Sequence, residues 1–284
     1  MGTPHVDYLI IGAGIAGASA GYWLAPHGRV QLLERESQAG YHSTGRSAAM
    51  FMECYGNAQV RALTRASRPF LQQPPAGFAE HPLLQPRGSV LVAAPGDEDK
   101  LAQEWQTLRE RSPQLQLLSA AEVCALVPVL RPERVLGGIL DPDAADIDAH
   151  ALHQGYLHGL HQAGGRVSTD AEVSAIRRVD GRWLVTAGGQ DWSANVLVNA
   201  AGAWADDIAE LASVPRIGLE HRRRTAFTFA APPGLAFHHW PMVENIHEQW
   251  YFKPDAGQLL ASPANADPVP PQDVQPEEID IATG

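Results

Sequence analysis

Three glycines and one glutamate near the N-terminus have the spacing of a dinucleotide-binding site. Gly12, Gly14 and Gly17 form a G-x-G-x-x-G run, and Glu34 follows 22 positions after Gly12 (34 − 12 = 22). In such a run the first glycine permits a tight turn, the second lets the backbone approach a pyrophosphate, and the third lets the helix pack closely on the strand. A carboxylate at this distance accepts hydrogen bonds from ribose hydroxyls and repels a 2′-phosphate. These residues alone predict FAD or NAD, not NADP, and the alternative is a tight turn that binds no ligand.

The elements around these residues favour a bound nucleotide. Residues 6–11 are mostly apolar and rich in β-branched side chains, the apolar pattern resumes with helical spacing at Ile15, and residues 30–33 form a second strand. Strand, glycine turn, helix and strand follow in order, so phosphates are expected on free N–H groups at the helix start. A buried strand over 196–198 leads in the same way into the small residues of 199–204.

Hydrophobic periodicity, capping residues and breakers divide the rest of the chain. Helices are expected over 57–70, 97–111, 119–127 and 149–162, and strands over 89–94, 137–140, 166–168, 172–179, 182–187, 224–230 and 249–253. Ser119 and Glu122 have capping-box spacing, Asp148 is expected to cap the helix that follows it, and Asp180-Gly181 predicts a hairpin. A proline-rich loop over 267–276 precedes a helix start at Pro276.

The composition limits the class of protein. The chain has 284 residues, of which 45% are hydrophobic and 19% charged, with a formal net charge of −11; these values are typical of a globular protein of one or two domains. This charge argues against nucleic acid and anionic membrane surfaces as partners. The longest apolar stretch, residues 8–20, is too short to span a bilayer. We therefore expect no transmembrane segment, and a cytoplasmic location.

Two polar clusters and the cysteines do not predict a metal site. The acids of 141–148 lack the closing glutamate of a calcium loop, so turn and cap roles are expected for them. The histidines at positions 150, 153, 158 and 161 are expected on the surface of their helix. Cys54 and Cys124 give neither a disulfide framework nor metal-ligand spacing.

Several longer motifs resemble those of one enzyme family. They lie at residues 7–22, 40–49, 146–156, 198–204 and 253–257. Together they resemble FAD-dependent D-amino-acid dehydrogenases and oxidases, the family that includes glycine and sarcosine oxidases, with D-arginine dehydrogenases the nearest likeness. The resemblance extends along the whole chain and indicates FAD rather than NAD.

The resemblance also implies a fold. It is an α/β fold with a Rossmann-type FAD-binding domain at residues 1–50 and 140–215. A discontinuous second domain at residues 51–139 and 216–284, built on an antiparallel β-sheet plus helices, covers the flavin and binds substrate. The family's C-terminal segment is expected to be missing after Gly284, and with it a second carboxylate-binding arginine and a glycine-rich loop.

By the same resemblance FAD is expected to bind non-covalently. The adenosine diphosphate half is expected to be bound by Gly12, Ala13, Gly14, Ile15, Ala16, Gly17, Glu34 and Arg35. The flavin side is expected to be lined by Ser43, Thr44, Gly45, Arg46, Ser47 and Ala48. The adenine is expected to contact the backbone of Val173, and the dinucleotide to be covered by Ala201, Gly202 and Trp204. In such enzymes a hydride passes from the substrate Cα to flavin N5, and the imino acid hydrolyses to a 2-oxo acid and ammonia.

Tyr55, Arg224 and Tyr251 match the family's substrate-side positions. A guanidinium is suited to binding a carboxylate through two hydrogen bonds, and tyrosine hydroxyls orient a carboxylate or an amine. The alternatives are a solvated face for Arg224, within its run of three arginines, and half-buried strand packing for the tyrosines.

Two substrate-pocket positions depart from the D-arginine-directed pattern. Ser89 stands where those members have an acid, and Met50 where they have a histidine. Neutral or apolar D-amino acids are therefore expected in preference to cationic ones. A glycine- or sarcosine-type amine oxidase and a truncated, inactive FAD-binding fragment are the alternatives, and the electron acceptor is left open between oxygen, a quinone and another acceptor.

Overall fold

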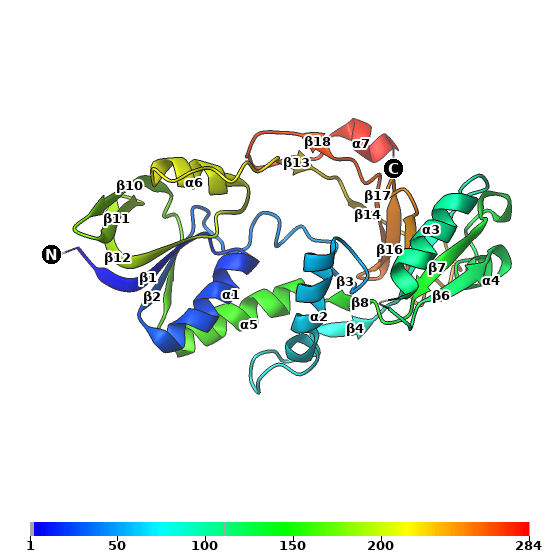
Figure 1. The fold of residues 1–284 in the computed structure, drawn as a ribbon, viewed down its shortest axis with the longest axis horizontal. Coiled ribbons are helices and arrows are strands. Elements are labelled where there is room, and N and C mark those ends of the chain that lie inside the picture. Colours follow the sequence, from blue (N-terminus) through cyan, green and yellow to red (C-terminus); the bar gives the residue numbers. More distant parts are fainter. Residues whose placement is uncertain (1–2, 111, 284) are drawn as a thin grey trace.

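A mixed six-stranded sheet forms one end of the molecule in the computed structural model, which describes residues 3–110 and 112–283 (Figure 1). Its strand order is β10-β11-β12-β1-β2-β9. The parallel strands are β1 (His5–Ile11), β2 (Val30–Leu33), β9 (Arg166–Ser168) and β12 (Gln190–Asn199). The strands β10 (Val173–Val179) and β11 (Arg182–Ala187) form an antiparallel hairpin that continues into β12.

Helices cover both faces of this sheet. On one face lie α1 (Ile15–Leu24) and α5 (Ala149–Gln162), and on the other lies α6 (Ala205–Leu211) (Figure 1). Because side chains alternate along a strand, Ile10 and Leu32 pack toward α1 and α5, whereas Leu9 and Leu33 pack toward α6. The two apolar layers hold the carboxyl ends of β1 and β2 in place, next to the glycine turn.

A seven-stranded sheet forms the other end of the molecule, in the order β14-β17-β16-β15-β5-β7-β6. Its strands are β5 (Ser89–Ala93), β6 (Gln116–Ser119), β7 (Gly137–Asp141), β14 (Phe227–Phe229), β15 (Met242–Asn245), β16 (Tyr251–Asp255) and β17 (Gln258–Ser262). All neighbouring strands are antiparallel except β5 and β15. The helices α3 (Glu98–Arg109) and α4 (Ala120–Leu126) pack beside β5, β6 and β7.

Smaller elements connect the two sheets. One small sheet consists of β3 (Met50–Phe51), β4 (Leu84–Pro86) and β8 (Ala145–Ile147), and another of β13 (Arg222–Arg223) and β18 (Asp267–Pro268). Two further α-helices are α2 (Ala58–Gln72) and α7 (Glu278–Thr283), and the 3-10 helices are Ala25–His27, Pro132–Arg134 and Gly202–Trp204. No helix among the described residues is both long enough and apolar enough to cross a membrane.

The predicted fold class is confirmed: a Rossmann-type parallel core is joined to a largely antiparallel sheet with helices. The capping box of Ser119 with Glu122 and the cap at Asp148 are also present. The helix expected over 97–111 is α3, and Arg111 lies outside the described residues.

The structure corrects two expectations about strands. Val196, expected in a buried strand, is 44% exposed, because β12 pairs with β1 along this stretch but with β11 only as far as Ala194. The strand expected over 224–230 is restricted to 227–229, so Arg224 lies in the short segment between β13 and β14.

Candidate functional site

A cavity of about 1160 Å³ extends from the first sheet to the second. At one end it is lined by Ile11 and Leu33, at the carboxyl ends of β1 and β2. At the other end it is lined by Tyr251 and Leu260, on β16 and β17. Ligands of open parallel sheets bind at the carboxyl ends of the strands, so the position of the cavity fits a nucleotide.

The glycine turn brings the backbone to the wall of this cavity. Gly12 has φ +98°, and a Cβ there would collide with the carbonyl oxygen of Ala200, so only glycine fits. A Cβ on Gly17 would collide with the carbonyl oxygen of Gly12. Gly14 lines the cavity, and the nearest atom to a Cβ placed on it is the Thr44 hydroxyl oxygen at 3.2 Å. The first and third glycines therefore serve packing within the chain, and the second leaves space at the cavity.

Glu34 is held rigidly at the same end of the cavity. Its Oε2 accepts the N–H of Ala13 at 2.8 Å, and its Oε1 accepts the N–H of Glu36 at 3.0 Å. The side chain lines the cavity although the residue is only 7% exposed. Each oxygen has a further lone pair, so the carboxylate is able to accept hydroxyl groups of a ribose.

One N–H group at the helix start is already used within the chain. The Ile15 N–H donates to Thr44 Oγ1 at 3.0 Å, which ties the loop after β2 to the start of α1. The N–H groups of Gly12 and Ala13 are also used, by the carbonyl oxygen of Leu33 and by Glu34 Oε2, so phosphate oxygens are left the remaining N–H groups of this turn. The N–H groups expected to bind phosphate at the helix start therefore do not include that of Ile15.

His153 is buried, contrary to the expectation that the histidines of α5 lie on the surface. It is 3% exposed, and its Nε2 donates to the carbonyl oxygen of Ala13 at 2.8 Å. His150, His158 and His161 are exposed as expected. His153 therefore links α5 to the glycine turn, and not to a metal: within 3–110 and 112–283 no three metal-ligating side chains come together.

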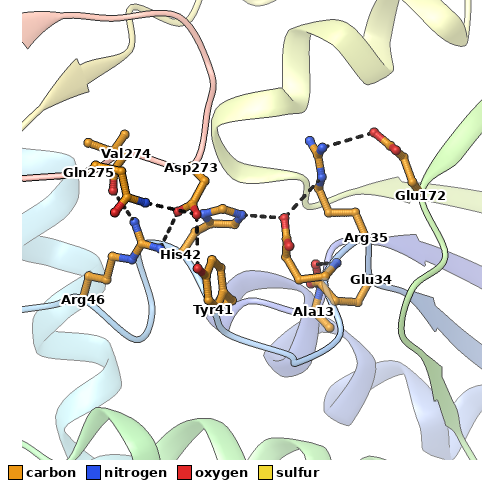
Figure 2. Close-up of polar contacts among 11 residues, drawn as sticks. Ala13, Glu34, Arg35, Tyr41, His42, Arg46, Glu172, Asp273, Val274 and Gln275 are labelled. Atoms are coloured by element: carbon orange, nitrogen blue, oxygen red, sulfur yellow. Dashed lines mark hydrogen bonds and ion pairs between the residues drawn. The ribbon is translucent and has the colours of Figure 1, made fainter.

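Two segments far apart in the sequence meet over the cavity (Figure 2). The loop of 40–48 and the segment of 269–276 both supply lining residues. Arg46 donates to Asp273 Oδ1 at 2.7 Å and to the carbonyl oxygen of Val274 at 2.9 Å, and the Tyr41 hydroxyl donates to Asp273 Oδ2 at 3.1 Å. The hydrogen bond from Arg46 lowers the pKa of Asp273.

The nucleotide end of the cavity is closed by a second set of contacts. Arg35 pairs with Glu172 at 3.2 Å, and its guanidinium lies 4.6 Å from the ring centroid of Trp204. The same Trp204 ring contacts His42, whose Nε2 is 2.9 Å from Glu36 Oε1. Arg35 and Trp204, both predicted to lie around the dinucleotide, thus line the same cavity.

A second cavity of about 620 Å³ opens from the first. The two share Ser47, Ala48, Arg224 and Tyr251. Most of the remaining wall of the second cavity is apolar and consists of Met50, Phe51, Met52, Val60, Leu63, Leu71, Ile147 and Met242. Its other polar side chains are Tyr55, Thr64, Ser67 and Glu244.

Arg224 is the member of the arginine run that faces both cavities without an ion pair among the described residues. Arg222 pairs with Glu220, and Arg223, whose side chain is 11% exposed, pairs with Asp267, Glu277 and Asp280. Tyr251 is 8% exposed and Tyr55 46% exposed. Burial and the nearby carboxylates of Glu248 and Glu244 raise the pKa of Tyr55.

Most of the predicted site residues line one of these cavities. The larger one is lined by Gly12, Gly14, Glu34, Arg35, Ser43, Thr44, Gly45, Arg46, Ser47, Ala48, Val173, Ala201, Gly202, Trp204, Arg224 and Tyr251. The smaller one adds Met50 and Tyr55. Ala13, Ile15, Ala16, Gly17 and Ser89 line neither. Ser89 is 4% exposed and lies in register with Met242 of β15.

Neither cysteine lines a cavity. Cys54 donates to Asp141 Oδ2 at 3.3 Å, and burial raises its pKa to about 12. Cys124 packs against the core beneath α4. A thiol of this chain is therefore not placed to react with a bound group.

Glu244 is the functional candidate that the sequence did not indicate. Burial, with the neighbouring Glu248 as a second cause, raises its pKa to about 7. It lies on β15, a four-residue strand that the sequence analysis does not predict. Its four residues, Met-Val-Glu-Asn, show no alternation of apolar and polar side chains, so no local pattern indicates a strand here.

Comparison with known proteins identifies the family. A family model described as "FAD dependent oxidoreductase" (DAO) matches residues 7–283. Human mitochondrial dimethylglycine dehydrogenase is 24% identical over 266 residues, which are 91% of this chain and 30% of that protein. L-2-hydroxyglutarate dehydrogenase of Escherichia coli (strain K12) is 25% identical over 226 residues, 75% of this chain and 50% of that protein. The chain thus spans less than a third of the first relative and half of the second.

A solved structure supports the same fold. The crystal structure of glycine oxidase from Geobacillus kaustophilus matches with a TM-score of 0.80 and 22% identity, and covers 99% of this chain and 76% of its own. At this identity the likeness concerns the fold.

Proposed function

The chain belongs to the DAO family of FAD-dependent oxidoreductases and has FAD as its cofactor; on this premise we propose that it oxidises small amino acids at Cα. The observation that carries the proposal is the position of Arg224. It lies where the cofactor cavity opens into a mostly apolar second cavity, and no ion pair among the described residues neutralises it. A guanidinium in this position is suited to binding the carboxylate of a substrate next to the cofactor.

The residues around the cavities fit FAD. Glu34 and the space at Gly14 suit the ribose and the pyrophosphate, and the second cavity opens beside Ser47 and Ala48, which are assigned to the flavin side. When bound, FAD supplies the acceptor for the hydride that leaves Cα. Arg224 binds the substrate carboxylate, and the hydroxyls of Tyr55 and Tyr251 fix its orientation. The apolar wall excludes water from the remainder of the substrate.

For the substrate itself we propose D-amino acids with neutral or apolar side chains. The apolar wall formed by α2 and β3, including Leu63 and Met50, supports this choice. Ser89 does not line the cavity, so it does not contact a substrate bound there. Oxidation gives an imino acid, which water hydrolyses to a 2-oxo acid and ammonia without a nucleophile from the protein.

A glycine or N-methylglycine substrate is the second candidate. It is favoured by the likeness to dimethylglycine dehydrogenase. Such substrates have the same carboxylate for Arg224 but no side chain to fill the apolar wall. The second cavity, at about 620 Å³, is larger than glycine needs.

Product analysis under air or with an artificial electron acceptor tests the proposal. The chain is supplied with FAD and given D-alanine, D-leucine, D-lysine, L-alanine, glycine and sarcosine in turn. We expect a 2-oxo acid and ammonia from D-alanine and D-leucine. Glyoxylate from glycine and sarcosine alone would favour the second candidate, and no product from any compound would favour an inactive FAD-binding fragment.

A further inference from the structure

The second cavity contains an acidic side chain to which the proposed function gives no role. Glu244 of β15 lies in register with Tyr251 of β16. Directly opposite residues of an antiparallel pair project from the same face, with Cβ atoms about 5 Å apart. Because Tyr251 lines both cavities, Glu244 lies beside the opening between them.

The carboxylate of Glu244 has no bonding partner in residues 3–110 and 112–283, where none of the hydrogen bonds or ion pairs involves it. The charged and titratable groups that face it come from several elements. They are Arg224 between β13 and β14, Cys54 and Tyr55 after β3, Tyr251 on β16, and Glu248 after β15. Burial and repulsion by Glu248 raise the pKa of Glu244 to about 7, and Arg224 opposes this rise.

Arg224 and Glu244 thus present opposite charges to one cavity without forming an ion pair with each other. An α-amino acid has a carboxylate and an ammonium group on the same carbon atom, so it is complementary to two such charges. The rest of the wall, which includes Met50, Leu63 and Met242, is apolar and suits an uncharged side chain. A ligand with only negative charge would gain from Arg224 and be repelled by Glu244.

We propose that Glu244 binds the ammonium group of the substrate while Arg224 binds its carboxylate, so that the site selects amino acids and amines over hydroxy acids. The proposal rests on the proposed function, which places the substrate in this cavity. It also separates two kinds of substrate within the family, because the relatives include a dimethylglycine dehydrogenase and an L-2-hydroxyglutarate dehydrogenase. A neutral hydroxyl group gains less from a carboxylate than an ammonium does.

This role makes ligand binding depend on pH in opposite directions for two kinds of ligand. An ammonium ligand prefers the ionised carboxylate, so its affinity rises as Glu244 loses its proton near pH 7. A carboxylate ligand without an amine is repelled by the ionised form, so its affinity falls over the same range. Between about pH 6 and 8 the ionised fraction of a group with a pKa of about 7 rises roughly tenfold.

The test is calorimetric titration of the full chain, supplied with FAD, with 2-aminoisobutyrate and with isobutyrate. The first has an amine but no hydrogen on Cα, so it is not oxidised, and the second is its analogue without the amine. We expect the affinity for 2-aminoisobutyrate to rise up to about tenfold from pH 6 to 8, and that for isobutyrate to fall. Release of a proton on binding 2-aminoisobutyrate near pH 7 accompanies the rise.

Two variants separate this role from a merely structural one. Glu244→Gln is expected to remove the pH dependence of the affinity for both ligands. It is also expected to abolish the preference for 2-aminoisobutyrate over isobutyrate at pH 8. Glu248→Gln is expected to keep the pH dependence of both affinities. The pH at which each affinity changes should move lower, because the like charge beside Glu244 is removed.

The role of Glu244 would be overturned if the affinities for the two ligands changed with pH in the same direction. It would also be overturned if the opposite pH dependences persisted in Glu244→Gln. If amino acids are still oxidised in that case, the proposed function stands. If the opposite slopes are observed but no amino acid or amine is oxidised, the ammonium site stands and the proposed function is wrong.

Discussion

Arg46 and Asp273, which are 227 positions apart in the chain, form a 2.7 Å hydrogen-bonded ion pair above the cofactor cavity. The pair joins the loop after β2, which contacts the glycine turn, to the segment that precedes α7 (Figure 2). Tyr41 donates to the same carboxylate. On this side the cofactor cavity is therefore bounded by two segments that a few exposed polar contacts hold together.

Asp273→Asn is expected to speed the dissociation of FAD. Exposed ion pairs contribute modestly, so the expected increase in the rate constant is roughly two- to fivefold. Stopped-flow dilution into an FAD scavenger measures the rate. Glu278→Gln, an exposed change on α7, is the matched control. Equal rates for Asp273→Asn and the unaltered chain would show that the segment of 269–276 does not retain the cofactor.

Glu34→Ala is expected to weaken FAD binding. The loss of a charge-assisted hydrogen bond to a ribose hydroxyl costs about 1.5–3 kcal/mol, which corresponds to a roughly 10- to 150-fold higher Kd. Fluorescence titration of the chain with FAD measures the Kd, and circular dichroism checks the fold. Glu210→Ala, on the exposed side of α6, is the control. An unchanged Kd for Glu34→Ala would remove Glu34 from the ribose site.

Arg224→Ala is expected to raise the KM for the amino acid strongly, because the substrate carboxylate loses its charged partner. The absorbance spectrum of bound FAD should be unaltered, since the cavity at Gly14 and Glu34 does not change. Arg222→Ala is the matched control, because Arg222 is a neighbouring arginine that pairs with Glu220. Steady-state kinetics of the two variants decide between substrate binding and a solvated face for Arg224.

Asp206→Asn is expected to lower the thermal midpoint by a few degrees at pH 7. The Asp206 carboxylate accepts the N–H groups of Ile217, Gly218 and Leu219 at 2.9, 3.0 and 2.9 Å. These hydrogen bonds lower the pKa of Asp206 below the ordinary 3.8, and the bond from Leu219 has the largest effect. The stabilisation is therefore present above pH 3.8 and is lost as the pH falls through the lowered pKa. A difference in midpoint that does not shrink as the pH falls below 3.8 would contradict this assignment.

The parts of the fold that follow from short-range sequence patterns were predictable. The strand, turn, helix and strand of 6–33 are specified by neighbouring residues, and so are the caps at Ser119 and Asp148. The exposure of Val196 was not, because it depends on which strands pair with each edge of β12. The burial of His153 depends likewise on the contact of α5 with the glycine turn.

The substrate side shows the same limit. Ser89 was predicted to face the substrate, yet it lies opposite Met242 and lines neither cavity, whereas Glu244, one strand away, does line the smaller one. Which side chain of two adjacent strands reaches a cavity is set by their register, and two short strands distant in sequence contain no local signal for it. Arg224 was found only through the family resemblance, since its run of three arginines is typical of a solvated face.

The proposed function requires that an amino acid bound in the second cavity passes a hydride to FAD in the first. Its most direct test is the absorbance of FAD bound to the full chain after anaerobic addition of D-alanine, compared with D-lactate. We predict that D-alanine bleaches the flavin absorbance with formation of pyruvate, and that D-lactate does not. Bleaching by D-lactate alone, or a spectrum that no amino acid or amine alters although FAD is bound, would contradict the proposed function.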